Sequence, residues 1–256
     1  MLNEMENLPK IPSPNQIVPV RDLSILKEPR GFIKPLQWIL SIFAFATTCS
    51  VETQTGFSVS CPKLEEYTYP ISYPFVLDLS VKVPVCGSNI VPNVASFTYS
   101  GKSSSEFYVF IGVMAFLYCL AALVVYVFFD EVYRKNTRLT IIDFIVTAVF
   151  ALMWLISSSA WAQGVTDLKY YSDPTDGIFL KLKECDMIYN NYTITCTPTV
   201  KPNFSTLDVS IIFGFLNTFV WIGNLWFLYK ETPWFMVQAA PPMDPGMPQE
   251  TDPQRV

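Results

Sequence analysis

Asp143, Asn217 and Asn224 are the polar side chains best placed to do chemistry, because each falls inside a long apolar segment where polar groups are costly. At about 100° per residue, Asn217 and Asn224 share a helix face with Gly214, a pattern that could line an ion or proton path. The alternative is structural. Asp143 lies one turn inside its segment and completes a capping box with Thr140, while amides hydrogen-bond neighbouring helices. We favour the structural interpretation.

A run of small residues in the third apolar segment, beginning with Ser157 and Ser158, is a candidate contact surface. Small side chains allow helices to approach closely, either inside one bundle or between subunits. Both interpretations stay open, and the internal one is preferred. The candidate helix-packing or partner face therefore consists of Ser157, Ser158, Gly214, Asn217 and Asn224.

The residue types argue against an enzyme. Histidine is absent from the 256 residues, which excludes Ser-His-Asp and Cys-His relays and His-ligated haem or zinc. The ten glycines are scattered and form no phosphate-binding loop. We therefore expect no catalytic, cofactor-binding or metal-binding residues and no cofactor. The net charge of -5, with no basic run, argues against nucleic acid as a partner.

Two polar connections each contain two cysteines: Cys61 with Cys86, and Cys185 with Cys196. An even number in each connection is typical of loops that face an oxidising lumen. A membrane thiol oxidoreductase would need a close reactive pair such as C-x-x-C, and neither connection has one. This enzyme class is therefore disfavoured.

The second connection also contains two glycosylation sequons, at Asn191 and Asn203. Asn191 is the stronger candidate, because Asn203 falls close to the expected membrane surface. Two further cysteines, Cys49 and Cys119, fall in apolar segments and are expected to be buried thiols.

Four apolar segments are long enough to span a bilayer, at about 33–51, 107–129, 139–162 and 207–229. The first is the weakest, because Lys34 and Pro35 interrupt it. Hydrophobic residues make up 51% of the chain and charged residues 15%, which is too little charge for a soluble domain of this length. The chain is predicted to be an all-α transmembrane protein. Capping boxes mark three helix starts, Ser103-x-x-Glu106, Thr140-x-x-Asp143 and Ser205-x-x-Asp208.

Lysine and arginine cluster before the first span, between the second and third, and after the fourth, so these segments are expected in the cytosol. Residues 31–232 form one four-span domain, with lumenal loops at 52–106 and 163–206. Residues 1–30 and the proline-rich 233–256 are expected to be disordered cytosolic tails. Residues 77–83 and 57–60 alternate apolar and polar types, which predicts a small lumenal sheet tied by the cysteines of the first loop.

Several longer motifs occur in order over about residues 28 to 234. They are Gly31-Phe32-Ile33-Lys34, Tyr73-Pro74-Phe75, Ala151-Leu152-Met153-Trp154, Phe213-Gly214-Phe215-Leu216-Asn217 and Trp221-Ile222-Gly223-Asn224. Together they resemble the synaptophysin family. The short C-terminal segment lacks the Tyr, Gly and Gln repeats of neuronal synaptophysin and is more similar to the pantophysin-like branch.

The resemblance implies a four-helix MARVEL bundle in which lumenal cysteines pair within each loop, Cys61 with Cys86 and Cys185 with Cys196. It also implies residence in secretory, endocytic or synaptic-type vesicles. The implied partners are cholesterol, the vesicle SNARE synaptobrevin, the vacuolar ATPase and further copies of the chain. The leading hypothesis is a non-enzymatic membrane protein that organises or sorts vesicle proteins and lipids. The alternative is a channel or transporter that uses the face of Asp143, Asn217 and Asn224.

Overall fold

The computed structural model describes residues 29–61, 63–83, 93–129, 133, 136–182, 185, 188–189, 192–232 and 235. The segments before residue 29 and after residue 235 lie outside the described residues, as do Cys86, Asn191 and the side chain of Cys61. The disorder of the tails, the pairing of Cys61 with Cys86 and the use of Asn191 therefore stay predictions.

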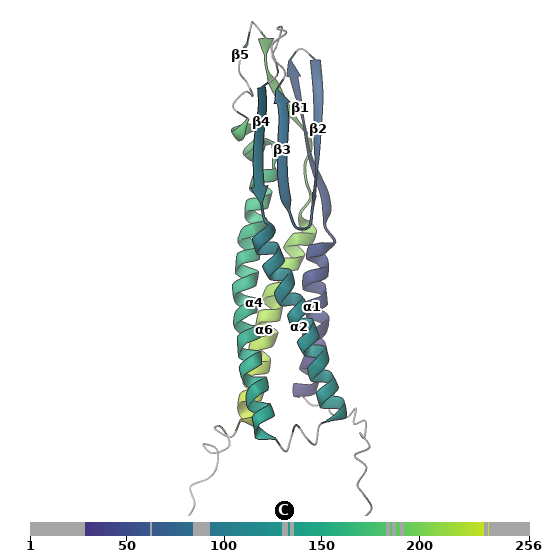
Figure 1. The fold of residues 1–256 in the computed structure, drawn as a ribbon, viewed down its shortest axis with the longest axis vertical. Coiled ribbons are helices and arrows are strands. Elements are labelled where there is room, and N and C mark those ends of the chain that lie inside the picture. The colour runs from purple at the N-terminus through teal and green to yellow at the C-terminus, as the bar shows by residue number, and fades with distance from the viewer. Residues whose placement is uncertain are drawn as a thin grey trace, which may run out of the picture.

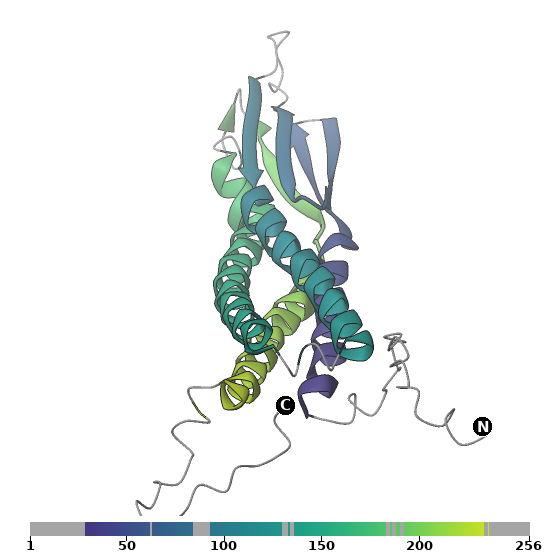
Figure 2. The same cartoon turned by 60° about the horizontal axis from the view of Figure 1, so that its bottom comes forward.

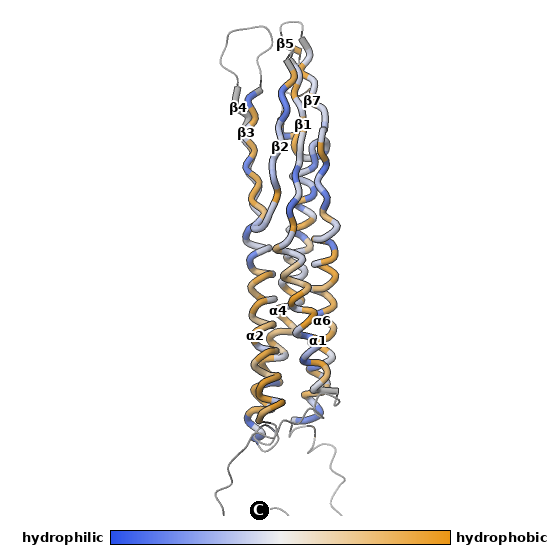
Figure 3. Tube along the Cα trace, turned by 90° about the vertical axis from the view of Figure 1, so that its right-hand side faces the viewer, coloured by the Kyte–Doolittle hydropathy of each residue, from blue (hydrophilic) through white to orange (hydrophobic). Residues whose placement is uncertain are grey.

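Four long helices form the membrane bundle: α1 (Pro29–Cys49), α2 (Lys102–Phe128), α4 (Thr137–Ser172) and α6 (Ser205–Glu231) (Figure 1). Each contains a stretch long and apolar enough to cross a bilayer, which confirms the predicted all-α transmembrane fold. In Figure 3, hydrophobic residues dominate the helices, whereas the strands above them mix hydrophobic and hydrophilic residues. The helical part is therefore the part that lies in lipid.

Helix α4 is much longer than a bilayer requires. Its 36 residues correspond to about 54 Å, whereas the hydrocarbon core is about 30 Å thick. The expected span stopped at residue 162, but the helix continues to Ser172 beside the strands (Figure 1). Val165 and Leu168, in this extension, are buried in the same core as the strand residues. The extension therefore anchors the strands to the bundle.

The three predicted capping boxes are wrong. Helix α2 follows Gly101 and α6 follows Phe204, and neither of these two positions provides a side-chain cap. In α4 the cap is Asn136, whose side chain accepts a hydrogen bond from the backbone N–H of Arg138. Thr140 therefore lies inside the first turn of the helix, too late to cap it.

A strand-rich cap covers one end of the bundle, and we call the opposite end the base (Figures 1 and 2). An antiparallel sheet of order β2-β1-β7 contains β1 (Glu52–Cys61), β2 (Lys63–Ser72) and β7 (Thr195–Val200). A separate hairpin pairs β3 (Val76–Val83) with β4 (Asn93–Ser100), and β5 (Ile188–Tyr189) pairs with β6 (Tyr192–Thr193). The π-helical segment η2 (Pro174–Ile178) and the short α5 (Phe179–Lys181) follow α4.

The alternating pattern at 77–83 correctly predicted a half-buried strand. In β3, Leu77, Leu79 and Val81 are buried, and the intervening side chains are exposed. Tyrosine hydroxyls join the two main sheets: Tyr67 donates to the carbonyl of Lys82, and Tyr69 donates to that of Ser80, each at 2.8 Å. The predicted disulfide between Cys185 and Cys196 is present and ties β7 to the segment after α5.

The turn between β2 and β3 joins the cap to the bundle. Phe75 has a positive φ of 63° and is fully buried. Its carbonyl accepts a hydrogen bond from the backbone N–H of Gly101 at 2.9 Å, and the carbonyl of Pro74 accepts one from the hydroxyl of Ser105 at 3.2 Å. The turn is thus bonded to the start of α2.

Candidate functional site: a buried ion pair in an aromatic bundle

Large aromatic side chains fill the interior of the bundle. Trp154, Trp161, Trp221 and Tyr108 are all fully buried. The ring of Tyr108 lies 5.8 Å from that of Trp154 and 6.0 Å from that of Trp161, and Trp161 donates its indole N–H to the hydroxyl of Ser210 at 2.9 Å. Stacked and edge-to-face rings pack densely. The centre of the bundle is therefore packed, with α2, α4 and α6 joined through aromatic contacts.

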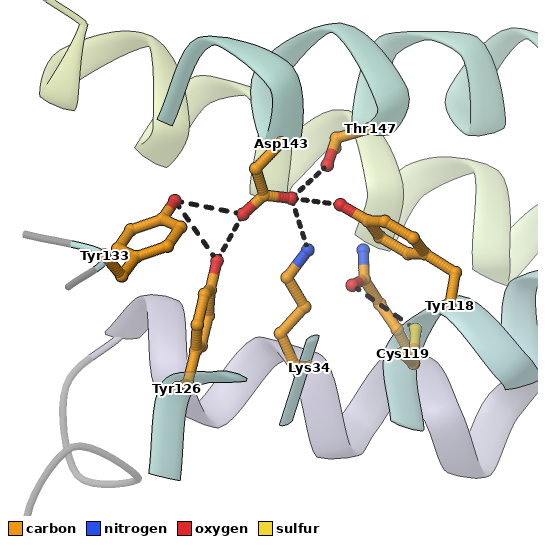
Figure 4. A network of polar contacts seen from close by, with 8 residues as sticks. Lys34, Tyr118, Cys119, Tyr126, Tyr133, Asp143 and Thr147 are labelled. Carbon is orange, nitrogen blue, oxygen red and sulfur yellow. Dashed lines mark hydrogen bonds and ion pairs between the residues drawn. The ribbon is translucent and has the colours of Figure 1, made fainter. Parts of the chain in front are cut away.

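A buried ion pair links α1 with α4 near the base. The Nζ atom of Lys34 lies 3.0 Å from Oδ1 of Asp143, and Lys34 is fully buried (Figure 4). A charge inside a membrane bundle is expensive unless a partner compensates it. The pair places one positive and one negative side chain at the same depth.

Hydroxyl groups surround the Asp143 carboxylate (Figure 4). Tyr118 and Thr147 donate to Oδ1, while Tyr126 and Tyr133 donate to Oδ2; the bond from Thr147 is 3.3 Å long and that from Tyr133 is 3.1 Å long. An ionised carboxylate only accepts hydrogen bonds, so these donors are well matched to it. The arrangement stabilises a negative charge inside the bundle.

Aromatic faces surround the ammonium group of Lys34. Its Nζ lies 4.9 Å from the ring centroid of Tyr118 and 5.9 Å from those of Tyr126 and Trp221. Ring faces attract cations, more strongly where water is excluded. We call Asp143, Tyr118, Tyr126 and Trp221 the ammonium cage. The cage therefore combines residues from α2, α4 and α6 around one side chain of α1.

The sequence also matches a known protein family. Residues 25–227 match the MARVEL family, which is described as a membrane-associating domain. The chain belongs to the MARVEL family. The match covers α1, α2 and α4 in full and α6 as far as residue 227, and it agrees with the four apolar helices.

The interpretation of Asp143 as a capping residue is wrong for this MARVEL protein. Asp143 lies beyond the first turn of α4, where the backbone N–H groups already have helical partners, so its carboxylate is free to bind Lys34. Lys34, which interrupts the first apolar segment near its start, points into the bundle and is fully buried. The tyrosines of the site were missed. Tyr118 and Tyr126, two turns apart in α2, lie about 80° apart around the helix, close enough to face the same part of the bundle, and this spacing could have indicated the site.

The other predicted polar residues are not hydrogen-bonded to Asp143 in the described structure. Asn217 and Asn224 are fully buried, but Asn217 donates to the carbonyl of Phe213 at 2.9 Å, and neither amide has a hydrogen bond with Asp143 among the described contacts. Among the described contacts, hydrogen bonds therefore do not join Asn217 or Asn224 to Asp143, which is bonded within the ion-pair site. The oxygen of Asn217 and both polar atoms of Asn224 have no hydrogen-bond partner in the described structure.

The small residues belong to an internal contact between α4 and α6. Ser157 and Ser158 are fully buried, and a Cβ atom added to Gly214 would lie 2.5 Å from Oγ of Ser158. Of the cysteines in helices, Cys119 is buried as expected, but Cys49 is exposed, because it is the last residue of α1 at the cap end. Asn203 is exposed just before α6, and its side chain accepts hydrogen bonds from Ser205.

Proposed function

We propose that this MARVEL protein is a non-enzymatic organiser of transport vesicles, which gathers or sorts membrane proteins and lipids in secretory or endocytic traffic. The observation that carries the proposal is the contrast between a packed interior and apolar outer faces. The centre is filled by Trp154, Trp161 and Trp221, whereas large apolar side chains such as Phe110 and Phe219 point outward. Such a bundle offers its surface, and not its interior, to other membrane components.

The orientation and location rest on charge, disulfide and resemblance. Arg138 and Lys230 are exposed at the base, which supports a cytosolic base and cytosolic termini. The disulfide between Cys185 and Cys196 supports a cap in an oxidising lumen. The synaptophysin-type motifs then support vesicle membranes as the location. On the same resemblance, the proposed partners are cholesterol, synaptobrevin, the vacuolar ATPase and further copies of the chain.

Cross-linking of intact vesicles tests this function. The vesicles are cross-linked before they are solubilised in mild detergent, and the proteins joined to this chain are identified by mass spectrometry. The control is the same vesicle protein solubilised before cross-linking, which removes neighbours held only by the membrane. Recovery of further copies, together with a synaptobrevin-type SNARE or vacuolar ATPase subunits, is expected. Consistent absence of the chain from purified vesicles contradicts the proposal.

A channel or transporter is the second candidate, because Asn217 and Asn224 retain polar atoms without hydrogen-bond partners inside the described bundle. Buried unpaired polar groups are uncommon and invite a functional explanation. Flux of ions or protons is measured in liposomes that contain the purified chain, with Asn217→Leu as the variant. Flux that falls in this variant favours a channel, and absence of flux under every gradient excludes it.

A further inference from the structure

Helix α1 differs from its neighbours in how it uses polar residues. It has the lowest hydropathy of the four candidate spans. Its outward side chains are apolar, whereas its polar side chains are turned into the bundle. The fully buried polar residues of α1 are Lys34, Gln37, Ser41 and Thr48. Entry of α1 into lipid is therefore less favourable than for the other helices unless the bundle compensates these groups.

Two of these polar groups are satisfied within the helix itself. Ser41 donates to the carbonyl of Trp38 at 2.8 Å, and Thr48 donates to that of Ala44 at 3.0 Å. Lys34 cannot be satisfied in this way. Its ion-pair partner is on α4, and the aromatic faces around its ammonium group are on α2 and α6. The charge of α1 is compensated only after the three later helices have assembled.

The ion pair also crosses the bundle. Helix α1 packs against α2 and α6, while Asp143 lies on α4, which packs on the far side of the same two helices. Figure 4 shows Lys34 reaching from α1 to Asp143. A single side chain thus connects α1 to the helix with which it shares least packing.

We propose that insertion of Lys34 into the ammonium cage is what keeps α1 packed against α2 and α6. Without this insertion, α1 does not stay in the bundle. Loss of Asp143 leaves the Lys34 ammonium without its acceptor, so α1 detaches from the bundle. Loss of Lys34 is milder, because the hydroxyls of Tyr118 and Tyr126 still donate to the carboxylate. Replacing both residues with leucine removes the uncompensated charge and restores docking.

The test measures docking of α1 on α2 in the full chain, in membranes. A Cβ atom at Gly112 would lie 3.1 Å from Cβ of Phe45, so Phe45→Cys with Gly112→Cys places two cysteines within reach of a disulfide after a small shift. Cys49→Ser and Cys119→Ala remove the nearby native thiols. Disulfide formation on mild oxidation is followed by mass spectrometry of the joined peptides.

Asp143→Leu is expected to slow this cross-link about tenfold, because it leaves the Lys34 ammonium without its ion-pair partner inside the membrane. Lys34→Leu is expected to slow it much less, and the double variant to recover the parent rate. The matched control is Asp208→Leu, which removes an exposed carboxylate paired with Lys169 on the cap side and should leave the rate unchanged.

Two results overturn the proposal. One is an unchanged cross-link in Asp143→Leu. The other is a double variant as slow as Asp143→Leu, because the loss then arises in α4 and not from the Lys34 charge. If Asp143→Leu does not accumulate in the membrane, the double variant still decides the question. If the double variant accumulates and forms the cross-link at the parent rate, the proposed role of Lys34 in holding α1 is supported. If the double variant fails to accumulate, that role is rejected.

Discussion

The ring of Phe75 lies 5.4 Å from the ring of Trp161, so a turn between two strands of the cap contacts a membrane helix directly. Phe75→Ala is expected to lower the free energy of unfolding by about 3–5 kcal/mol, because it empties a fully buried aromatic site. Thermal unfolding in detergent measures the loss, and limited proteolysis shows whether the cap loosens first. Val76→Ala, at an exposed neighbouring position, is the control; equal effects of the two changes contradict the role of Phe75.

Close packing of α4 on α6 depends on Gly214. An added methyl group would lie 2.5 Å from Oγ of Ser158 and 2.7 Å from the hydroxyl of Tyr108, so Gly214→Ala is expected to destabilise the bundle by about 1–3 kcal/mol. Gly223→Ala is the matched control, because nothing lies within 4 Å of a Cβ there. Ser158→Ala should restore part of the loss. A Gly214→Ala variant as stable as Gly223→Ala would show that the helices can separate without cost.

The disulfide holds β7 to the rest of the cap. Cys185→Ser releases a link between residues 11 apart in sequence and should cost about 2–4 kcal/mol. Hydrogen exchange of the β1 and β7 amides, followed by mass spectrometry, is expected to accelerate. Cys49→Ser, which removes an exposed free thiol, should change neither stability nor exchange. Protection of β7 that survives in Cys185→Ser would mean that pairing with β1 suffices.

The cap is expected to weaken in alkali. Burial, with the nearby Glu65 carboxylate, raises the pKa of Tyr67 to about 12, and burial, with Asp167, raises the pKa of Tyr99 to about 12. A tyrosine with a raised pKa contributes stability below its unfolded pKa of about 10, and this contribution is lost as pH rises through about 12. Tyrosinate absorbance and unfolding, measured over this range, should change together. Tyr67→Phe and Tyr99→Phe should each reduce the pH dependence; an unchanged dependence in both assigns it to other groups.

The helices and strands could be predicted because they depend on local periodicity. Long apolar segments predicted the transmembrane fold, and the alternation of Leu77, Leu79 and Val81 predicted β3 with its correct buried face. Helix starts were less predictable. Ser103 and Thr140 match a capping motif, but α2 begins after Gly101 and α4 is capped by Asn136.

The ion-pair site could be predicted only in part. Asp143 was recognised as an unusual intramembrane acid, but its partner Lys34 is 109 residues away and lies at a helix end, where a cytosolic position was equally reasonable. Nothing local in the sequence distinguishes a lysine that points to water from one that points into the bundle. The tyrosine donors have the same difficulty, because aromatic residues are also common at membrane surfaces.

Helix α4 runs without a break from the base into the cap, so the two ends of the molecule are connected by one helix. A rod of about 54 Å that tilts by about 5° moves its far end sideways by about 5 Å. Because Val165 and Leu168 fix the cap to the end of this rod, the strands must follow such a tilt. A change in the tilt of α4 at the base would therefore move the cap sideways on the opposite side of the membrane.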